Sequence, residues 1–206
     1  MSFFEPSPPA PARQGAHRLP AWAGPPENEL GVAVPLRLVL ARTEELTLAL
    51  LDVVAYSTGF GLQLGLRLHP EASLDPGGLL LRQLHGQTGD EQLRFGVEFA
   101  DGRKATNQAP RRPAGEEELP ISLVVRGGRG SSGGLSYDLG YWVFPLPPPG
   151  RLTVAVEWLA RGLEETRHDL EADSILEAAS QSVELWQDNR PVGRRPPPST
   201  GEIRIT

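Results

Sequence analysis

The sequence predicts an all-β fold, an antiparallel β-sandwich of the immunoglobulin-like or jelly-roll kind, with one short helix late in the chain. Two observations carry this prediction. Several segments alternate apolar and polar residues with the period of a half-buried strand. Gly, Pro, Asp and Asn residues separate these segments, which is typical of the turns in a sandwich of roughly seven to nine strands.

Three strand-like segments occur in the first part of the chain. Residues 34–41 and 46–56 are dense in Leu and Val. The next segment, "FGLQLGLRL" (60–68), alternates strictly, so Gln63 and Arg67 are expected to face solvent. The apolar face of this segment consists of Phe60, Leu62, Leu64, Leu66 and Leu68.

Further strand-like segments follow after residue 90. Asp101-Gly102 comes directly after the alternating segment 93–99 and predicts a tight hairpin, because Gly tolerates a positive φ. The Gly-rich stretch 126–134 is expected to be a flexible loop. The other predicted strands are 121–125, 152–159 with Trp158 on its apolar face, and the short segments 183–186 and 203–205.

The segment "ADSILEAAS" (172–180) predicts the helix. Asp173 or Ser174 is suited to the N-cap, and Glu177 lies three residues after Ser174, as in a capping box. A short apolar face is formed by Ile175, Leu176 and Ala179. The acidic run 163–173 precedes the helix, and its carboxylates are expected to be solvated.

The predicted domain spans residues 30–186 and lies between two Pro-rich tails. Residues 1–29 contain seven of the 21 prolines and few large apolar groups. Such a segment cannot bury enough apolar surface to offset chain entropy, so we expect a disordered or polyproline-like tail. Residues 187–206 form a second, basic tail. Three apolar anchors in the first tail either fold back onto the sandwich or dock into a partner: Phe3, Phe4 and Trp22.

The composition excludes several functions. A net charge of -6 and a pI near 5.3 argue against a positively charged surface that could bind nucleic acid or an anionic membrane. The chain has no cysteine, which rules out disulfides, thiolate zinc sites and cysteine nucleophiles. It shows neither a signal-peptide pattern nor a run of about 18 apolar residues. We therefore expect a cytoplasmic protein.

No motif for catalysis, metal binding or a cofactor stands out, and the sequence leaves open whether the protein is an enzyme. His168 with Glu164, Glu165 and Asp169 is the nearest approach to a metal cluster. In an extended segment, however, Asp169 points away from the others, and such runs are usually solvated. The Gly-rich stretch 126–134 lacks both the Lys of a P-loop and the strand-to-helix elbow of a serine nucleophile.

The stretch "LSYDLGYWVFPLPPPG" (135–150) raises the main question, because both faces of the strand that it predicts are apolar. One face belongs in the core, and the other needs a cover. The chain itself offers the helix 173–181 and Trp22 as covers, whereas an external cover would be a partner held by aromatic residues. The two faces are Tyr137, Leu139, Tyr141 and Val143 on one side, and Trp142, Phe144 and Leu146 on the other.

These observations favour a non-enzymatic protein-interaction or structural module whose partner is an unidentified protein, and a homo-oligomer is also compatible with them. The candidate interaction residues are Phe3, Phe4, Trp22, Tyr137, Tyr141 and Trp142. The alternative is a β-sandwich that binds a small ligand or a carbohydrate, with or without hydrolytic activity. That alternative requires a solvent-open pocket formed by Tyr137, Tyr141 and Trp158.

Four long stretches resemble an uncharacterised family of actinobacterial proteins. They are "MSFFEP", "LGVAVPLRLVLARTE", "LRFGVEFADGRKATN" and "YWVFPLPPPGRLTVAVEWLARGLEETR", and the likeness extends over most of the chain. The resemblance implies a cytoplasmic bacterial protein from a GC-rich genome. It implies no activity, ligand, partner or site residue.

Overall fold

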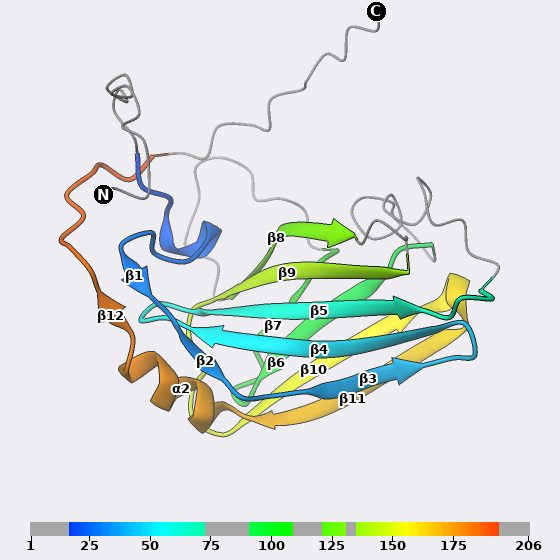
Figure 1. The fold of residues 1–206 in the computed structure, drawn as a ribbon. Coiled ribbons are helices and arrows are strands. Elements are labelled where there is room, and N and C mark those ends of the chain that lie inside the picture. The colour runs from blue at the N-terminus through cyan, green and yellow to red at the C-terminus, as the bar shows by residue number, and fades with distance from the viewer. Residues whose placement is uncertain (1–16, 73–90, 109–120, 131–134, 194–206) are drawn as a thin grey trace, which may run out of the picture.

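In the computed structural model, the chain forms an antiparallel β-sandwich (Figure 1). The structure describes residues 17–72, 91–108, 121–130 and 135–193. Within these ranges it contains twelve strands in three sheets and one α-helix. The predicted all-β sandwich with a short helix late in the chain is confirmed. The predicted strand at 203–205 lies outside the described residues.

The larger sheet has six strands, in the order β2-β4-β5-β9-β8 with β3 also paired to β4. A single strand was expected over 34–41, but Pro35 lies between two strands and offers no N–H to a ladder. The bounds are β2 Val32–Val34, β3 Leu38–Arg42, β4 Leu46–Ala55, β5 Phe60–Leu68, β8 Ser122–Gly130 and β9 Ser136–Phe144.

Strand β8 corrects the prediction of a flexible loop that begins at residue 126. Residues 127–130 continue the ladder with β9, after a register shift between Val125 and Gly127. Gly127 has a φ of 121°, and a glycine at positive φ lets a strand bulge and bend without strain. The glycines therefore bend this strand instead of ending it.

The smaller sheet has the order β11-β10-β6-β7. The predicted hairpin at Asp101-Gly102 is confirmed, because β6 and β7 pair antiparallel and Gly102 has a φ of 85°. The acidic run, for which no strand was predicted, forms most of edge strand β11, where charged side chains discourage further pairing. The bounds are β6 Arg94–Phe99, β7 Lys104–Thr106, β10 Arg151–Trp158 and β11 Leu163–Glu171.

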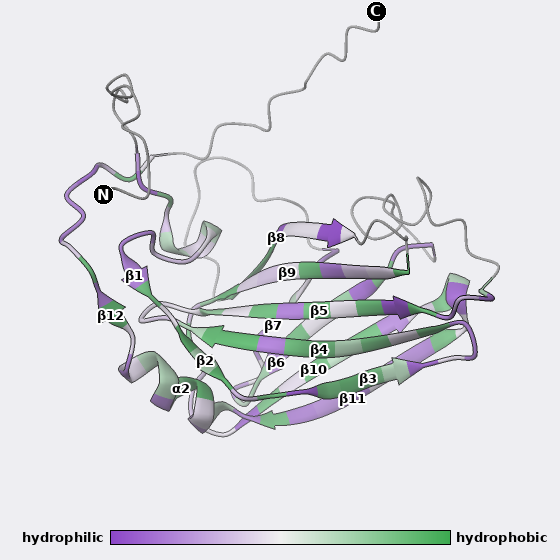
Figure 2. Ribbon diagram, in the orientation of Figure 1, coloured by the Kyte–Doolittle hydropathy of each residue, from purple (hydrophilic) through white to green (hydrophobic). Residues whose placement is uncertain are grey.

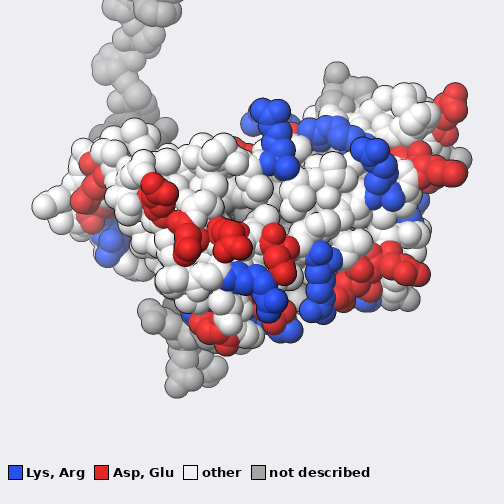
Figure 3. Space-filling view, turned by 90° about the horizontal axis from the view of Figure 1, so that it is seen from below, with Lys and Arg blue, Asp and Glu red and all other residues white. Residues whose placement is uncertain are grey.

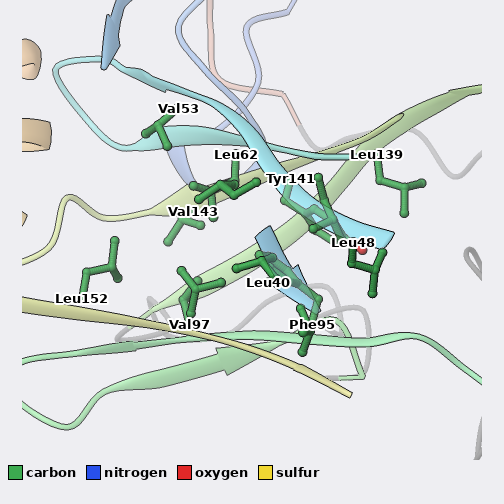
Figure 4. Close-up of a cluster of buried hydrophobic side chains, with 14 of the residues drawn as sticks. Leu40, Leu48, Val53, Leu62, Phe95, Val97, Leu139, Tyr141, Val143 and Leu152 are labelled. Carbon is green, nitrogen blue, oxygen red and sulfur yellow. The ribbon is translucent and has the colours of Figure 1, made fainter. Parts of the chain in front are cut away.

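The core lies between the two sheets and is built by the alternating faces of their strands (Figure 4). The alternation predicted for β5 is confirmed, since its five apolar side chains are buried while Arg67 is exposed. Strand β4 keeps an apolar inner face across a bulge at Leu51, where the pairing with β5 shifts. Its buried side chains are Leu46, Leu48, Leu50, Val53 and Ala55.

One edge of the sandwich is closed by side chains of β11 that reach a bulge in β3. The pairing of β3 with β4 shifts between Val39 and Ala41, which marks Leu40 as the bulged residue. The Thr166 hydroxyl donates to the Leu40 carbonyl oxygen at 2.9 Å. His168 Nε2 lies 2.7 Å from the same oxygen and donates to it when the proton is on Nε2. These contacts join the two sheets at this edge.

The helix α2 (Ala172–Ser180) confirms the predicted helix but not its predicted start. The N-cap residue is Glu171 and makes no capping side-chain bond, so the prediction of Asp173 or Ser174 is wrong. Because α2 begins where β11 ends, the Ser174 hydroxyl donates back to the Glu171 carbonyl at 3.0 Å instead. The helix packs against β4 and β2 through Ala172, Ile175, Ala178 and Ala179, which are buried.

The strands carry green, hydrophobic segments between polar ones in Figure 2, as half-buried strands should. The face seen from below in Figure 3 carries charges of both signs interspersed. Charged side chains of the smaller sheet pair across neighbouring strands, as Lys104 does with Glu98 at 3.0 Å and Arg94 with Glu157. No helix among the described residues is both long and apolar enough to cross a membrane.

Candidate interaction surface

One of the two apolar faces of strand β9 packs in the core. The ring of Tyr141 lies 4.6 Å from the ring of Phe95 across the sandwich, and Trp158 is fully buried. These rings are closely packed, so the solvent-open aromatic pocket that a ligand-binding function requires is not formed by them. Tyr137 and Tyr141 are also inaccessible to a partner, and their assignment as interaction residues is wrong. The buried side chains of this face are Tyr137, Leu139, Tyr141 and Val143.

The opposite face of β9 is covered by the chain itself. Trp142 is 1 % exposed, and its indole Nε1 donates to the Ala21 carbonyl oxygen at 2.8 Å. The 3₁₀ turn Ala21–Ala23 lies against β9 and β8. Of the two covers considered from the sequence, the segment around Trp22 fulfils this role and helix α2 does not. Trp142 is therefore a buried packing residue, and its assignment as an interaction residue is wrong.

Residues 17–29 correct the prediction of a disordered tail. Ala23 is fully buried, and its carbonyl accepts a hydrogen bond from the Arg126 guanidinium at 3.0 Å. The Ser122 hydroxyl donates to the Trp22 carbonyl at 3.3 Å. The segment needs no core of its own, because it packs on the sheet and its backbone carbonyls meet donors from β8 and β9. Phe3 and Phe4 lie outside the described residues.

The segments before and after the sandwich pair with each other. Strand β1 (Glu29–Leu30) pairs antiparallel with β12 (Val183–Glu184), and farther along the Arg18 N–H donates to the Pro191 carbonyl at 3.1 Å. The Asn28 amide donates to the Trp186 carbonyl at 2.8 Å. We call residues 17–30 and 183–193 together the terminal ribbon. The blue and orange segments that form it lie side by side in Figure 1.

A charged cluster fastens the terminal ribbon. The Arg190 guanidinium donates to the Asp188 carboxylate at 2.6 Å and to the Glu27 carboxylate at 2.8 Å. The hydrogen bond from Arg190 lowers the pKa of Asp188 to about 2, and Arg18 contributes further. Asp188 therefore stays ionised throughout the physiological pH range. Residues 187–193, which the sequence assigns to a basic tail, are part of this ribbon.

The terminal ribbon exposes apolar side chains. Leu30 and Val183 are register partners in the pairing of β1 with β12, so their side chains emerge on the same face. The Leu185 N–H donates to the Asn28 carbonyl at 2.8 Å, which continues the pairing and places Leu185 on that face too. Trp186 follows Leu185 in the sequence, at the bend after the paired residues, and is 54 % exposed. We call these four the apolar patch: Leu30, Val183, Leu185 and Trp186.

The apolar patch contains half of the large hydrophobic residues that are exposed in the described part of the chain. The others are Val39, Leu135, Leu159 and Val192, and Val192 is also in the terminal ribbon. Sequence reasoning missed this patch. The signal was present in "VELW". In a strand, Val183 and Leu185 fall on one face and Trp186 on the other, and a strand of a two-stranded sheet cannot bury both of its faces.

The terminal ribbon itself lines most of a crevice, which Thr58 and Phe144 of the sandwich complete. Its volume is about 420 Å³, and its lining combines Trp22 and Phe144 with Thr58, Asp188 and several prolines. Trp22 is half-buried in the wall. Among the candidate interaction residues of the sequence, Trp22 is the one that the structure places at an accessible site.

The metal cluster considered around His168 does not form. His168 meets the Leu40 carbonyl, the Glu165 carboxylate accepts from Arg167 at 2.6 Å, and Asp169 accepts from the Thr153 hydroxyl at 2.6 Å. In the ranges that the structure covers, no group of three or more His, Asp or Glu side chains is placed to hold a metal ion.

Comparison of the chain with models of protein families, with curated proteins and with solved structures finds no match.

Proposed function

We propose that this protein is a non-enzymatic interaction module of the cytoplasm that binds another protein through the apolar patch of its terminal ribbon. The observation that carries the proposal is the clustering of Leu30, Val183 and Leu185 on one face of the two-stranded ribbon, with Trp186 next to them in the sequence, all of them about half exposed. Exposed apolar residues scattered singly are ordinary, whereas contiguous ones mark interaction sites. Trp and its apolar neighbours are the side chains that anchor protein interfaces.

The rest of the molecule supports the role of a scaffold for this patch. Both faces of strand β9 are buried. Its tyrosine rings pack in the core, and Trp142 packs beneath residues 21–23 of the terminal ribbon. The terminal ribbon is paired within itself, and hydrogen bonds from Trp142 and Arg126 to backbone carbonyls of residues 21 and 23 hold it on the sandwich. A rigid scaffold lowers the entropy cost of binding a partner.

A photo-crosslinking amino acid in place of Leu185 tests the proposal in lysate of the source cells. The matched control carries the same amino acid in place of Val39, which is 48 % exposed on β3 and away from the patch. We expect one defined protein to be crosslinked from position 185 and not from position 39. We also expect Trp186→Glu to remove that crosslink without lowering the thermal stability of the chain, because Trp186 is largely exposed.

Equal labelling from both positions, or a crosslink that survives Trp186→Glu, would overturn the proposal. A crosslink to a second copy of the chain would identify the partner as the protein itself. Deleting residues 1–29 is a poor test, because it also removes the carbonyl that accepts from Trp142 and so uncovers the sheet.

A further inference from the structure

The crevice that the terminal ribbon lines has the size of a site for one small molecule. Its volume of about 420 Å³ falls within the range of roughly 300–1,000 Å³ that is typical of ligand sites. Part of the wall is apolar, because Trp22 and Phe144 line the crevice and are half-buried, and the prolines 20, 25 and 26 add to it. Such side chains form a surface on which the C–H face of a small ring packs.

The same crevice carries planar polar side chains, which are a guanidinium, two carboxylates and an amide. They belong to Arg18, Glu27, Asn28 and Asp188. Three of them keep hydrogen-bonding capacity within the described part of the chain. The Arg18 guanidinium meets no acceptor there, and Glu27 uses only Oε2, which accepts from Arg190. Asn28 donates two hydrogen bonds through Nδ2, so its Oδ1 remains an acceptor.

The charges at the crevice balance each other. The Arg190 guanidinium donates to Asp188 at 2.6 Å and to Glu27 at 2.8 Å, and Arg18 lies close enough to Asp188 to help lower the pKa of that carboxyl. Two cations are thus matched by two carboxylates, and a ligand with a net charge of either sign gains little attraction. A neutral ligand with many hydroxyl groups fits better, because each hydroxyl donates to a carboxylate or amide oxygen or accepts from a guanidinium.

The polar part of the wall is ordered before a ligand arrives. The Asp188 side chain is 7 % exposed, and it accepts hydrogen bonds from the Arg190 backbone N–H at 3.1 Å and from the Arg190 Nε at 2.8 Å. The backbone of Arg18 is held by its hydrogen bonds with Pro191 and Gly193. Groups that are already in place lose little entropy when a ligand binds to them.

We propose that this crevice binds a neutral sugar. The pyranose ring packs against Trp22 and Phe144, which supply the aromatic wall. The sugar hydroxyls bond to the polar side chains that have capacity left, which are Arg18, Glu27 and Asn28. A free sugar and the end of an oligosaccharide share this chemistry, because both offer one ring and its hydroxyls.

The sugar site goes beyond the interaction function and does not depend on it, since the crevice and the apolar patch are lined by different residues. It also differs from the aromatic pocket that the sequence suggested for a ligand. That pocket is not formed, because Tyr141 and Trp158 are closely packed in the core.

Titration of the full chain with neutral sugars tests the proposal. The probes are glucose, galactose, mannose, maltose, cellobiose and lactose. The readout is the set of four indole N–H signals in a nitrogen-15 NMR spectrum, assigned with Trp→Phe variants. We expect at least one probe to shift the Trp22 signal saturably, while Trp158, which belongs to β10 and does not line the crevice, keeps its position. A disaccharide that binds more tightly than its monosaccharide would identify the end of an oligosaccharide as the ligand.

Two variants locate the binding in the crevice. Arg18→Met removes the donors of Arg18 but keeps its apolar stem and its backbone pairing, and we expect it to weaken binding about tenfold. The matched control is Arg37→Met, because Arg37 is also exposed, lies outside the crevice and has no hydrogen-bond partner among the described residues. This control should leave the affinity unchanged. Phe144→Leu keeps apolar volume but removes a ring of the wall, and it should weaken binding several-fold.

The absence of a saturable Trp22 shift with every probe would overturn the proposal, as would equal losses of affinity in Arg18→Met and Arg37→Met. A shift that grows linearly and appears equally at Trp186, which is 54 % exposed, would reveal a solvent effect and overturn it too. Free lysine and acetate are the charged probes, and saturable binding of either in place of the sugars would contradict a neutral ligand. None of these outcomes alters the crosslink expected from Leu185, so the two proposals are tested separately.

Discussion

The indole Nε1 of Trp142 donates to the carbonyl oxygen of Ala21 at 2.8 Å, across 121 positions of sequence. This bond explains how a strand with two apolar faces exists at the side of a sandwich. One face of β9 packs in the core, and the other packs against the 3₁₀ turn Ala21–Ala23. The interaction surface that we propose follows from this packing, because the chain continues from this turn into β1 of the terminal ribbon.

Trp142→Phe is expected to destabilise the fold by about 1–3 kcal/mol, because it leaves the Ala21 carbonyl without its donor and opens space under the 3₁₀ turn. Urea unfolding followed by circular dichroism measures this loss. Trp186→Phe is the matched control, since Trp186 is 54 % exposed, and its effect should stay within about 0.5 kcal/mol. Similar losses in the two variants would contradict the packing role of Trp142.

Much of the fold could be predicted from alternation alone. The inner faces of β5, β6 and β10 follow period two without interruption, and their apolar residues are buried as expected. The prediction failed where bulges or pairing partners decide the structure. Leu51 interrupts the period of β4, and the acidic β11 is a strand because β10 offers it an edge, which its composition does not reveal.

The interaction surface could not be predicted in the same way. Tyr137, Tyr141 and Trp142 are aromatic and were natural candidates, yet burial on both faces of β9 removes them from the surface. Residues 17–29 lack enough apolar side chains to fold alone, but their backbone carbonyls accept hydrogen bonds from side chains of β8 and β9. A disorder prediction from composition omits such contacts, because it considers each segment without its neighbours.

The Leu40 carbonyl provides a second prediction. Two side chains of β11, Thr166 and His168, reach this one oxygen at 2.9 and 2.7 Å. Thr166→Val and His168→Ala should each cost about 1 kcal/mol, whereas the double variant should cost more than their sum, because only then does the carbonyl lose both donors. A double-mutant cycle in urea measures the coupling. Strict additivity would show that the two contacts do not share the oxygen in solution.

The burial of Tyr141 leads us to expect that the free energy of unfolding falls at alkaline pH. Burial raises the pKa of Tyr141 from 10.0 to about 12, and the nearby Asn107 opposes this in smaller part. The fold therefore favours the neutral phenol, so the stabilisation is complete below pH 10 and is lost as pH rises from 10 towards 12. Unfolding midpoints measured across this range should fall in the wild type and fall less in Tyr141→Phe.

The same substitution should not destabilise the protein at neutral pH. The Tyr141 hydroxyl is buried, and the Asn107 side chain near it lies outside hydrogen-bond geometry, so removal of the hydroxyl relieves a desolvation cost of up to about 1 kcal/mol. A clear loss of stability in Tyr141→Phe at pH 7 would show that the hydroxyl has a partner in solution.

Gly59 and Gly61 give a matched pair of substitutions at the same end of β5. Gly59 closes the turn from β4, where its carbonyl accepts from the Tyr56 N–H at 2.9 Å. A Cβ on Gly59 would lie 2.4 Å from the Val143 carbonyl oxygen and 2.8 Å from the Trp142 ring, whereas a Cβ on Gly61 would meet nothing closer than 3.8 Å. Gly59→Ala must therefore displace backbone of β9, and Gly61→Ala need not.

We expect Gly59→Ala to cost about 1–3 kcal/mol through overpacking, and Gly61→Ala to change stability by less than about 1 kcal/mol in either direction. Because Gly59 lies against Trp142, its substitution should also shift the Trp142 indole signal and loosen the Ala21 contact above it. Thermal unfolding together with the indole NMR spectrum measures both effects. An unchanged Trp142 signal in a destabilised Gly59→Ala variant would place the clash on the strand backbone alone.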